Sequence, residues 1–197
     1  MVEVPKTARG RATLERIVAA ASKLVGERGV AETSLDDVIE RADVSKSQLY
    51  HYFEDRAELL RAVVVHNAEL VLNIVGPLDS WKAIRTSFDA LLDVQAERGA
   101  RGGCPIGTLV GQLAETDDQA RLALVASFTR WEERLSDGLR SMQSSGRLRR
   151  RADPHQLAIA TVATIQGGLL LTQIRRDPRQ LGIALDAAYA HLRTYAA

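Results

Sequence analysis

The sequence predicts an all-α protein, and three observations support this prediction. Hydrophobic residues make up 46% of the 197 positions, which is enough for a packed core. Apolar side chains recur at helical spacing along most of the chain, and no alternating β-branched run lies between turn residues. The five prolines fall at breaks between these periodic segments, where a proline fits the first turn of a helix.

The first predicted helix runs from about Ala12 to Arg28, behind a polar arm over residues 1–10. Its apolar side chains recur every three or four positions, which gives the helix one face that can be buried. Gly29 follows directly and ends the helix, because glycine readily adopts the left-handed conformation of a C-terminal cap.

A second helix is predicted to open at Thr33, whose hydroxyl can cap a backbone N–H at Asp36. Asp43 follows in a tight turn that needs a left-handed residue, a conformation that Asp adopts less easily than Gly. We therefore expect a short helix between these residues and a chain reversal at Asp43.

A short third helix is predicted to open at Ser45, which forms a capping box with Gln48. Asp55 then caps a long helix over about 56–76, with Glu58 as its box partner. Three such start signals follow closely on one another, so the helix boundaries are better defined here than elsewhere in the chain.

Two short helices joined by a tight turn form the geometry that places the second helix in the major groove of DNA. The second helix carries polar, cationic and aromatic side chains on its outer face, which suit phosphates and base edges. The candidate DNA-binding residues on it are Ser45, Lys46, Ser47, Gln48, Tyr50 and His51. The alternative is a helical hairpin whose polar face is merely solvated.

The stretch VSKSQLYHYFEDRAELL, from Val44 to Leu60, is similar to the DNA-binding module of TetR-family transcriptional regulators. The resemblance covers about residues 12–62. It implies that Thr33 contacts a phosphate, that Arg56 supplies a cation at the start of the fourth helix, and that the six residues named above form the recognition helix.

The stretch also departs from the family's usual pattern at two places. Asp43 stands where the family usually has Gly, which indicates an altered turn. Ser47 and Gln48 replace a commoner Gly-Thr pair, so we expect the sequence preference to differ while the mode of binding is kept.

The resemblance also implies how the chain is divided and what it does. Residues 1–56 would form a three-helix DNA-binding domain, and residues 57–197 a helical ligand-binding and dimerisation domain. The implied function is that of a ligand-responsive regulator, a repressor that a small-molecule effector releases from its operator. The implied partners are double-stranded DNA, an effector of unknown identity and a second copy of the chain.

Five further helices are predicted in the C-terminal part, at about 79–98, 105–115, 118–144, 154–175 and 178–195. Their breaks are rich in Gly, Ser and Asp, and Pro105, Pro154 and Pro178 stand at expected first helical positions.

The resemblance implies an effector pocket among the helices over residues 80–175. We select apolar helical positions that have a polar neighbour, because ligand pockets combine an apolar lining with a few polar groups. The candidate ligand-binding residues are Phe88, Leu92, Cys104, Gln112, Phe128, Trp131 and Gln166. The alternative for each is an ordinary core position, since apolar stripes at helical spacing usually face a core.

Cys104 precedes Pro105 and is predicted to be the N-cap of the next helix. A thiol at a helix N-terminus can have a lowered pKa and react readily, with Arg101 as a possible cationic neighbour. A regulator that senses oxidants or electrophiles through Cys104 is therefore an alternative, and a small residue that fills the helix start is another.

The last two helices are predicted to form a pairing surface between two copies of the chain. One repeats apolar residues in steps of four and three, and the other offers small residues for close approach. The candidate dimerisation residues are Ala160, Thr164, Gly167, Leu171, Leu181, Leu185, Ala188 and Leu192. The alternative is a core within one chain, but the uncharged stretch over 157–174 favours an interface, because a helix that is apolar on all sides must be buried all round.

Composition limits the other classes of function. The net charge is +1, so a DNA-binding surface needs placed contacts rather than an excess of positive charge. No metal-ligand cluster, phosphate loop or nucleophile motif is present, and we expect no catalytic residue, metal site or cofactor. A helical enzyme or a protein-interaction module is the alternative of another class.

The N-terminal residues have no apolar signal core, and the single cysteine allows no internal disulfide. We therefore expect a cytoplasmic protein. The stretch over 157–174 approaches the length of a membrane span, but its Thr, Gln and Gly residues favour a buried helix over a membrane partner.

Overall fold

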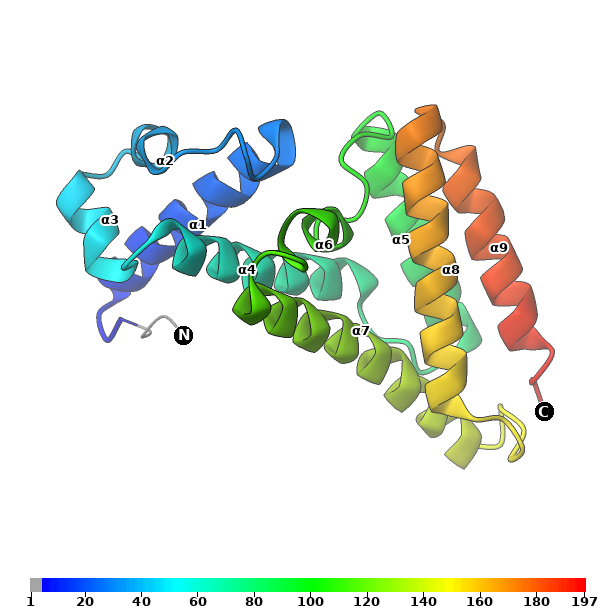
Figure 1. Cartoon of the computed structure of the whole chain (residues 1–197). Coiled ribbons are helices and arrows are strands. Elements are labelled where there is room, and N and C mark those ends of the chain that lie inside the picture. Colours follow the sequence, from blue (N-terminus) through cyan, green and yellow to red (C-terminus); the bar gives the residue numbers. More distant parts are fainter. Residues whose placement is uncertain (1–4) are drawn as a thin grey trace. The chain divides into compact units, whose positions relative to one another are not determined.

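The computed structural model describes residues 5–197, which fold into nine α-helices and contain no β-strand (Figure 1). The first four residues of the expected N-terminal arm lie outside the described part of the chain. The helices are α1 Ala8–Arg28, α2 Leu35–Ala42, α3 Lys46–Tyr52, α4 Arg56–Val75, α5 Trp81–Glu97, α6 Gly107–Leu113, α7 Asp118–Ser144, α8 Pro154–Arg175 and α9 Arg179–Arg193. The all-α prediction is confirmed.

The chain divides into two compact units. The first contains residues up to 69 together with 108–127, and the second contains 70–107 and 128–197. Residues 108–127 belong with the N-terminal helices because long-range bonds tie them there. The Val30 N–H donates to Gln112 Oε1 at 2.7 Å, and Arg61 pairs with Asp117 at 3.2 Å.

The first unit is built around α1, which packs against α2. Ile17 and Leu24 from α1, Leu49 from α3 and Phe53 after it are almost fully buried. The Ser22 hydroxyl also donates to Asn67 Oδ1 at 2.6 Å and so links α1 to α4. The polar link joins α1 to α4, and the burial of Leu49 and Phe53 anchors α3 in the same core.

The start of α2 differs from the prediction by one residue. Ser34, not Thr33, is the N-cap, and it forms a full capping box with Asp37 rather than Asp36. Thr33 is instead 4% exposed, and its hydroxyl donates to the Gly29 carbonyl at 2.8 Å. The residue pairs at 33/36 and 34/37 offer the same chemistry, and the burial of Thr33 decides between them.

The turn between α2 and α3 forms as expected. Asp43 adopts φ 50° and ψ 59°, the left-handed conformation, and its N–H bonds the carbonyls at the end of α2. Ser45 then opens α3 with the predicted capping box to Gln48. The helix-turn-helix therefore has the local geometry that the sequence indicates.

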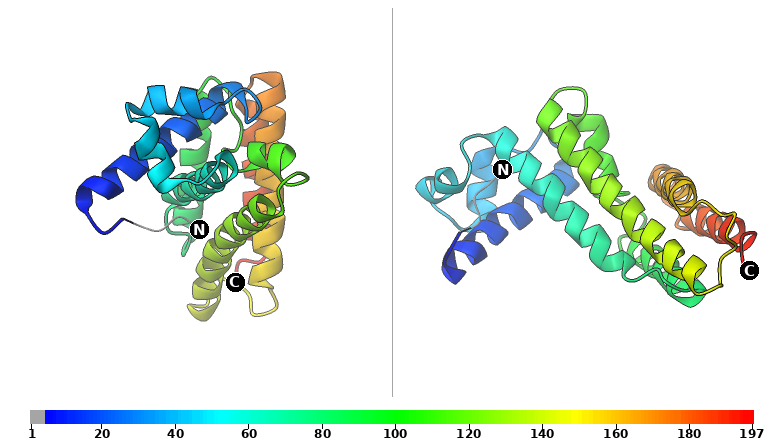
Figure 2. Two further views of the ribbon diagram at one scale, coloured as in Figure 1. Left: turned by 60° about the vertical axis from the view of Figure 1, so that its left-hand side comes forward. Right: turned by 90° about the horizontal axis from the view of Figure 1, so that it is seen from below.

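The second unit contains α5, α8 and α9, and the different views show α8 and α9 side by side (Figures 1 and 2). Their close approach centres on Gly168, where an added Cβ would lie 2.6 Å from the Cβ of Ala184. Gly138 of α7 has a comparable role, because a Cβ there would meet the backbone of Leu78.

The apolar seam of α9 requires a correction. We expected it to face a second copy of the chain, but its side chains are at most 4% exposed within one chain and α9 packs against α8 and α5. The residues concerned are Leu181, Leu185, Ala188 and Leu192. Steps of four and three describe a packing helix whichever chain supplies its neighbour.

Helix α8 is long and apolar enough, by length and composition, to cross a membrane, with a mean hydropathy of 1.6. Its buried face nevertheless packs on α9, and 44% of its apolar window is buried within the chain. The opposite face exposes Leu170, Leu171 and Ile174. A helix with one packed and one exposed apolar face is typical of a protein interface.

Candidate nucleic-acid interface and effector pocket

Helix α3 is a short platform of seven residues that buries only Leu49. Lys46, Ser47, Tyr50 and His51 are exposed on the opposite side, with Tyr50 47% exposed. Exposure of a tyrosine, a lysine and a histidine on two helical turns leaves several hydrogen-bond donors available to a ligand.

Two ring contacts orient these side chains. Lys46 Nζ lies 6.0 Å from the centre of the Tyr50 ring, and the His51 ring meets Tyr52 edge-on at 4.9 Å between centroids. Tyr52 is in turn anchored, because its hydroxyl donates to the Gly10 carbonyl at 3.3 Å. The face therefore has preferred side-chain positions before any ligand binds.

Ser45 and Gln48 are more constrained than the sequence indicates. Gln48 Oε1 accepts from the Ser45 N–H at 2.8 Å, and Ser45 Oγ accepts from the Gln48 N–H at 3.2 Å. An amide whose oxygen caps a helix has only its N–H₂ group left for a ligand. Paired bonds from Gln48 to an adenine would require this box to open.

Arg56 is not the free cation that the resemblance implies. Its Nε donates to the Thr33 carbonyl at 2.9 Å, and its Nη2 donates to the Val30 carbonyl. Both acceptors lie in the segment between α1 and α2. Arg56 therefore fixes this segment against the start of α4, and Thr33, with its buried hydroxyl, is likewise a structural residue in this conformation.

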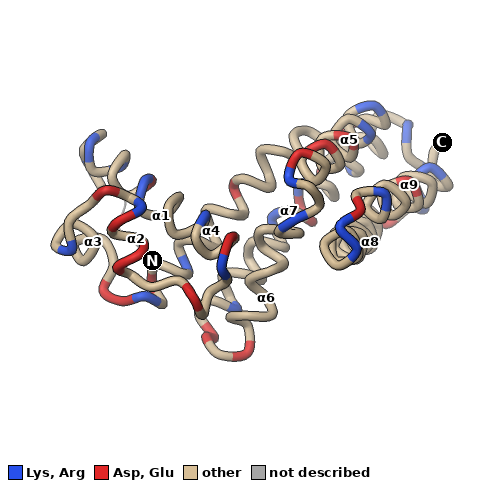
Figure 3. The backbone as a smooth tube through the Cα atoms, turned by 90° about the horizontal axis from the view of Figure 1, so that it is seen from above, with Lys and Arg blue, Asp and Glu red and all other residues tan. Residues whose placement is uncertain are grey.

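Helix α1 carries mostly basic residues with two glutamates, α2 is mostly acidic, and Lys46 is the one Lys, Arg, Asp or Glu of α3 (Figure 3). Some acidic groups are paired: Arg41 with Glu27 at 3.1 Å and Arg28 with Asp37 at 3.3 Å. The hydrogen bond from Ser34 keeps the pKa of Asp37 below its ordinary value of 3.8. These pairs reduce the negative potential near α3 without making the unit basic.

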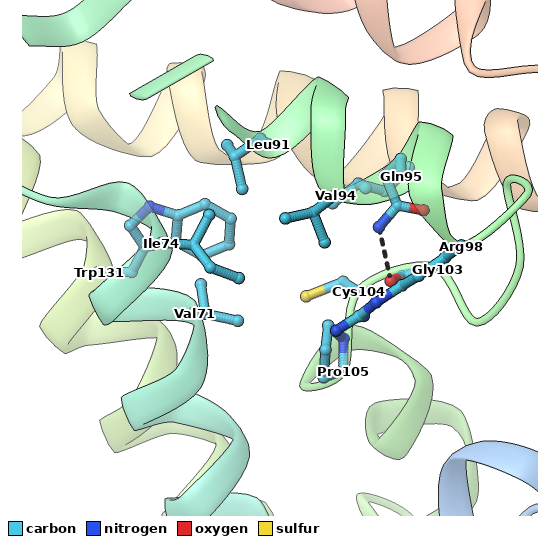
Figure 4. A pocket seen from close by; sticks show the side chains of 11 residues that line it. Val71, Ile74, Leu91, Val94, Gln95, Arg98, Gly103, Cys104, Pro105 and Trp131 are labelled. Carbon is cyan, nitrogen blue, oxygen red and sulfur yellow. Dashed lines mark hydrogen bonds between the residues drawn. The ribbon is translucent and has the colours of Figure 1, made fainter. Parts of the chain in front are cut away.

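A small cavity lies within the second unit, between side chains from α4, α5, α7, α8 and the loop before α6. Figure 4 shows Leu91 and Trp131 facing it from one side and Gln95 with Cys104 from the other. The lining residues are Val71, Ile74, Leu91, Val94, Gln95, Arg98, Gly103, Cys104, Pro105, Trp131 and Leu169. Its volume is about 20 Å³, which has room for about one water molecule.

Gln95 is the polar group of this cavity. The side chain is 4% exposed, and its Nε2 donates to the Gly103 carbonyl at 3.2 Å (Figure 4). Its Oε1 is buried and has no hydrogen-bond partner within residues 5–197. A buried acceptor without a donor costs free energy, so a donor supplied by a ligand or a water molecule would stabilise this site.

The loop that closes the cavity has an unusual backbone. Gly99, Ala100, Gly102 and Gly103 all have φ between 56° and 79°, in the left-handed region. For Ala100 this conformation is strained, and the residue is fully buried. A loop that combines three flexible glycines with one strained residue is suited to change conformation.

Cys104 follows this loop but is not a helix cap, because α6 begins only at Gly107. The residue is 5% exposed, and its Sγ accepts from Gln166 Nε2 at 3.4 Å. This burial removes the exposure that a reactive thiol requires. Pro105 likewise precedes the helix instead of opening it.

Of the seven predicted pocket residues, Cys104 and Trp131 line the cavity. Gln166 reaches it indirectly through Cys104, whereas Gln112 lies in the other unit and accepts from the Val30 N–H. The remaining three, Phe88, Leu92 and Phe128, are not among the lining residues.

The prediction missed Gln95, Arg98 and Gly103. A buried glutamine within an otherwise apolar stripe of α5, followed by the glycine-rich segment GARGG, was the available signal.

Among the described residues, no group of three or more His, Cys, Asp or Glu side chains is arranged to hold a metal ion. The four histidines lie on different helices.

Comparison with known proteins links both regions to one family. Residues 17–63 match the family described as bacterial regulatory proteins, tetR family. Residues 81–188 match the tetracyclin repressor-like C-terminal domain. The second match covers more than half of the chain.

Whole-chain relatives agree with these matches. An uncharacterized helix-turn-helix regulator of Mycobacterium tuberculosis is 30% identical over 178 residues, covering 83% of this chain and 85% of that protein. The transcriptional repressor DhaR of a Mycobacterium species is 24% identical and covers 90% and 91%. A solved TetR-family regulator from Cytophaga hutchinsonii has the same fold, with a TM-score of 0.81, 15% identity and 98% coverage of each chain.

Proposed function

The chain belongs to the TetR family of ligand-responsive transcriptional regulators, and we propose that it is a cytoplasmic, homodimeric repressor that binds its operator through α3. Members of this family bind DNA and usually act as dimers that respond to small molecules. The observation that carries the proposal is the exposed face of α3. Lys46, Tyr50 and His51 lie on this face, and Leu49 on the other side of the helix is buried in the core.

Within this proposal, α3 enters the major groove. Lys46, Tyr50 and His51 contact phosphates, and Ser47 and the Gln48 amide N–H₂ group face the base edges. Ser45 and the box to Gln48 fix where the helix begins. Thr33 and Arg56 support the interface by holding the segment between α1 and α2, rather than by touching DNA.

The proposed effector site is the cavity beside Gln95. It supplies an apolar wall with Leu91 and Trp131 and a single unsatisfied acceptor, the combination typical of small-molecule sites. Because the cavity has room for about one water molecule, a larger effector must displace the loop over residues 99–103. A ligand that prefers the opened state shifts the protein toward it.

A route from this cavity to the DNA-binding helices runs along the chain through α6. This helix begins three residues after Cys104 and carries Gln112, whose Oε1 accepts a hydrogen bond from the Val30 N–H at 2.7 Å. Arg56 contacts the carbonyl of the same Val30. We propose that movement of α6 disturbs this segment and thereby reorients α3.

Selection of duplex DNA from a random pool tests the proposed DNA binding. The expected result is enrichment of a two-part site whose halves lie one helical turn, about 34–36 Å, apart. Affinity for the selected duplex should fall steeply with salt, because several phosphates are neutralised. No enrichment over input at low salt would contradict the proposal.

The effector step is tested with the selected duplex. Small molecules that release the protein from DNA are expected to lose this effect in Gln95→Leu, which removes the acceptor, while DNA binding without effector is kept. Gln112→Leu should keep effector binding and weaken release. Unchanged release in both variants would contradict the proposed site and route.

A further inference from the structure

An open cleft on α7 has no role in the two sites described above. Its residues share one stripe of the helix, at steps of three and four, and the first turn of α8 adds one side chain. We call it the α7 cleft, and it is lined by Thr129, Glu132, Glu133, Ser136, Asp137, Arg140 and His155. It has about 670 Å³ of free space, far more than one water molecule needs.

The α7 cleft is suited to a guanidinium group. Its lining contains three carboxylates, those of Glu132, Glu133 and Asp137, and one arginine, Arg140. Arg140 pairs with Asp137 at 2.5 Å. Ser136 is 1% exposed, and its Oγ has no hydrogen-bond partner in the described part of the chain. A guanidinium carries five N–H donors in a fixed plane and can serve carboxylates and a hydroxyl together.

The neighbouring face of α8 indicates where such a group comes from. Between its ends this face is free of charge, and beyond the exposed Ile159 its side chains are small over residues 160–164 and large over residues 170–174. The small ones are Ala160, Ala163 and Thr164, and the large ones are Leu170, Leu171 and Ile174. Gly167 lies midway, and a Cβ built there would meet nothing within 4 Å.

This gradient of size is complementary to itself when two copies of α8 run antiparallel across a two-fold axis at Gly167. Position 160 then faces 174, and 163 faces 171, so each small residue meets a large one. In a parallel pair, small would face small and large would face large, leaving voids at one end and crowding at the other. An isologous two-fold interface is also the commonest form of homodimer.

In the same register, the N-terminal end of α8 lies beside the C-terminal end of the partner's α8. Position 159 faces 175, so the aliphatic stem of the partner subunit's Arg175 covers Ile159, which is 42% exposed. Ile159 lies one helical turn beyond His155, which lines the α7 cleft. Arg175 of the free chain is exposed and donates only to Gln180 Oε1, at 2.9 Å, among the bonds that the structure gives it.

We propose that two copies of this chain pair through antiparallel α8 helices centred on Gly167, and that the partner subunit's Arg175 docks in the α7 cleft against Glu132, Glu133 and Ser136. The inference rests on the proposed homodimer and adds its register and its polar anchor. Because the contact repeats by symmetry, each dimer contains it twice.

Disulfide mapping in a Cys104→Ser background tests the register. Gly167→Cys is expected to cross-link to itself under mild oxidation. Ala160→Cys and Ile174→Cys should cross-link only when the two variants are mixed, because each lies seven residues, about 10 Å, from the axis. Self-linking of either variant, or none at position 167, would overturn the register.

Charge exchange tests the anchor, with dimer dissociation measured by sedimentation. Arg175→Glu and Glu133→Arg should each weaken the dimer at least tenfold, and the double variant should recover most of that loss. Arg149→Glu, in an exposed loop, is the matched control and should change nothing. Purely additive losses would overturn the anchor, whereas a wild-type protein that is monomeric at all concentrations would overturn the proposed homodimer itself.

Discussion

Helices α3 and α8 expose opposite kinds of surface and are held in opposite ways. Helix α3 has seven residues, one of them buried, and begins in a capping box. Helix α8 has 22 residues, eight of them buried, and exposes Ile174 at 68% on its free face. The polar face suits a charged polymer, and the apolar face suits another protein.

The difference shows that the residues proposed to recognise DNA, on the outer face of α3, are not the residues that stabilise the fold, such as those on the inner face of α8. Local hydrogen bonds set the conformation of α3, so its outward side chains carry little of the folding free energy. Packing sets the position of α8, so substitutions on its inner face act on the whole second unit. Substitutions that act on packing, on polar ties and on caps should therefore destabilise the protein in that order.

Gly168→Leu should have the largest effect on folding. Its Cβ would lie 2.6 Å from the Cβ of Ala184, so α8 and α9 would have to separate, at a cost of about 3 kcal/mol. Urea unfolding measures the loss. Gly182→Ala is the control, because its Cβ would make an ordinary 3.9 Å contact with Leu92. Equal stability of Gly168→Leu and wild type would contradict the packing of α8 on α9.

Arg56→Ala should have the next largest effect. It removes two charged hydrogen bonds to the Val30 and Thr33 carbonyls, and we expect a loss of about 2 kcal/mol in urea unfolding. If Arg56 served only as a DNA contact, the variant would lose operator affinity and keep its full stability.

Ser45→Ala should cost about 1 kcal/mol, because the α3 N-cap and its box with Gln48 are lost. Ser47→Ala is matched to it in size and exposure and should leave the unfolding midpoint unchanged. A loss of stability as large in Ser47→Ala would show that α3 is not held by its cap.

Asp43→Gly should have the smallest effect and the opposite sign. The left-handed φ of 50° suits glycine better than aspartate, so we expect a gain of up to about 1 kcal/mol in thermal unfolding. A lower stability would mean that the Asp43 side chain makes a stabilising contact that outweighs the backbone strain.

The sequence predicted well what neighbouring residues decide. The Ser45–Gln48 box, the left-handed turn at Asp43 and all nine helices follow from local chemistry. It placed the cap of α2 at Thr33 instead of Ser34, because both residues carry a hydroxyl three positions before an aspartate. Only the tertiary burial of Thr33 distinguishes them.

What distant segments decide was predicted less well. The cavity needs α4, α5, α7 and α8 to converge, so Gln95 could not be singled out from its sequence neighbours. Arg56 was predicted to be a cation available to DNA. A sequence does not reveal that the Val30 and Thr33 carbonyls accept hydrogen bonds from its guanidinium group. The apolar face of α9 was predicted to contact a second chain, because helical spacing shows that a face is buried but not which neighbour buries it.

The proposed role of α3 can be tested directly by titrating a fluorescent duplex from the random-pool selection with the wild type and with Lys46→Ala/Tyr50→Ala. Both side chains are exposed, so the variant should unfold like the wild type. We expect its affinity to fall at least tenfold and its dependence on log salt to lessen by about one unit for the lost lysine contact. Wild-type affinity with an unchanged salt slope in a folded variant would contradict the account.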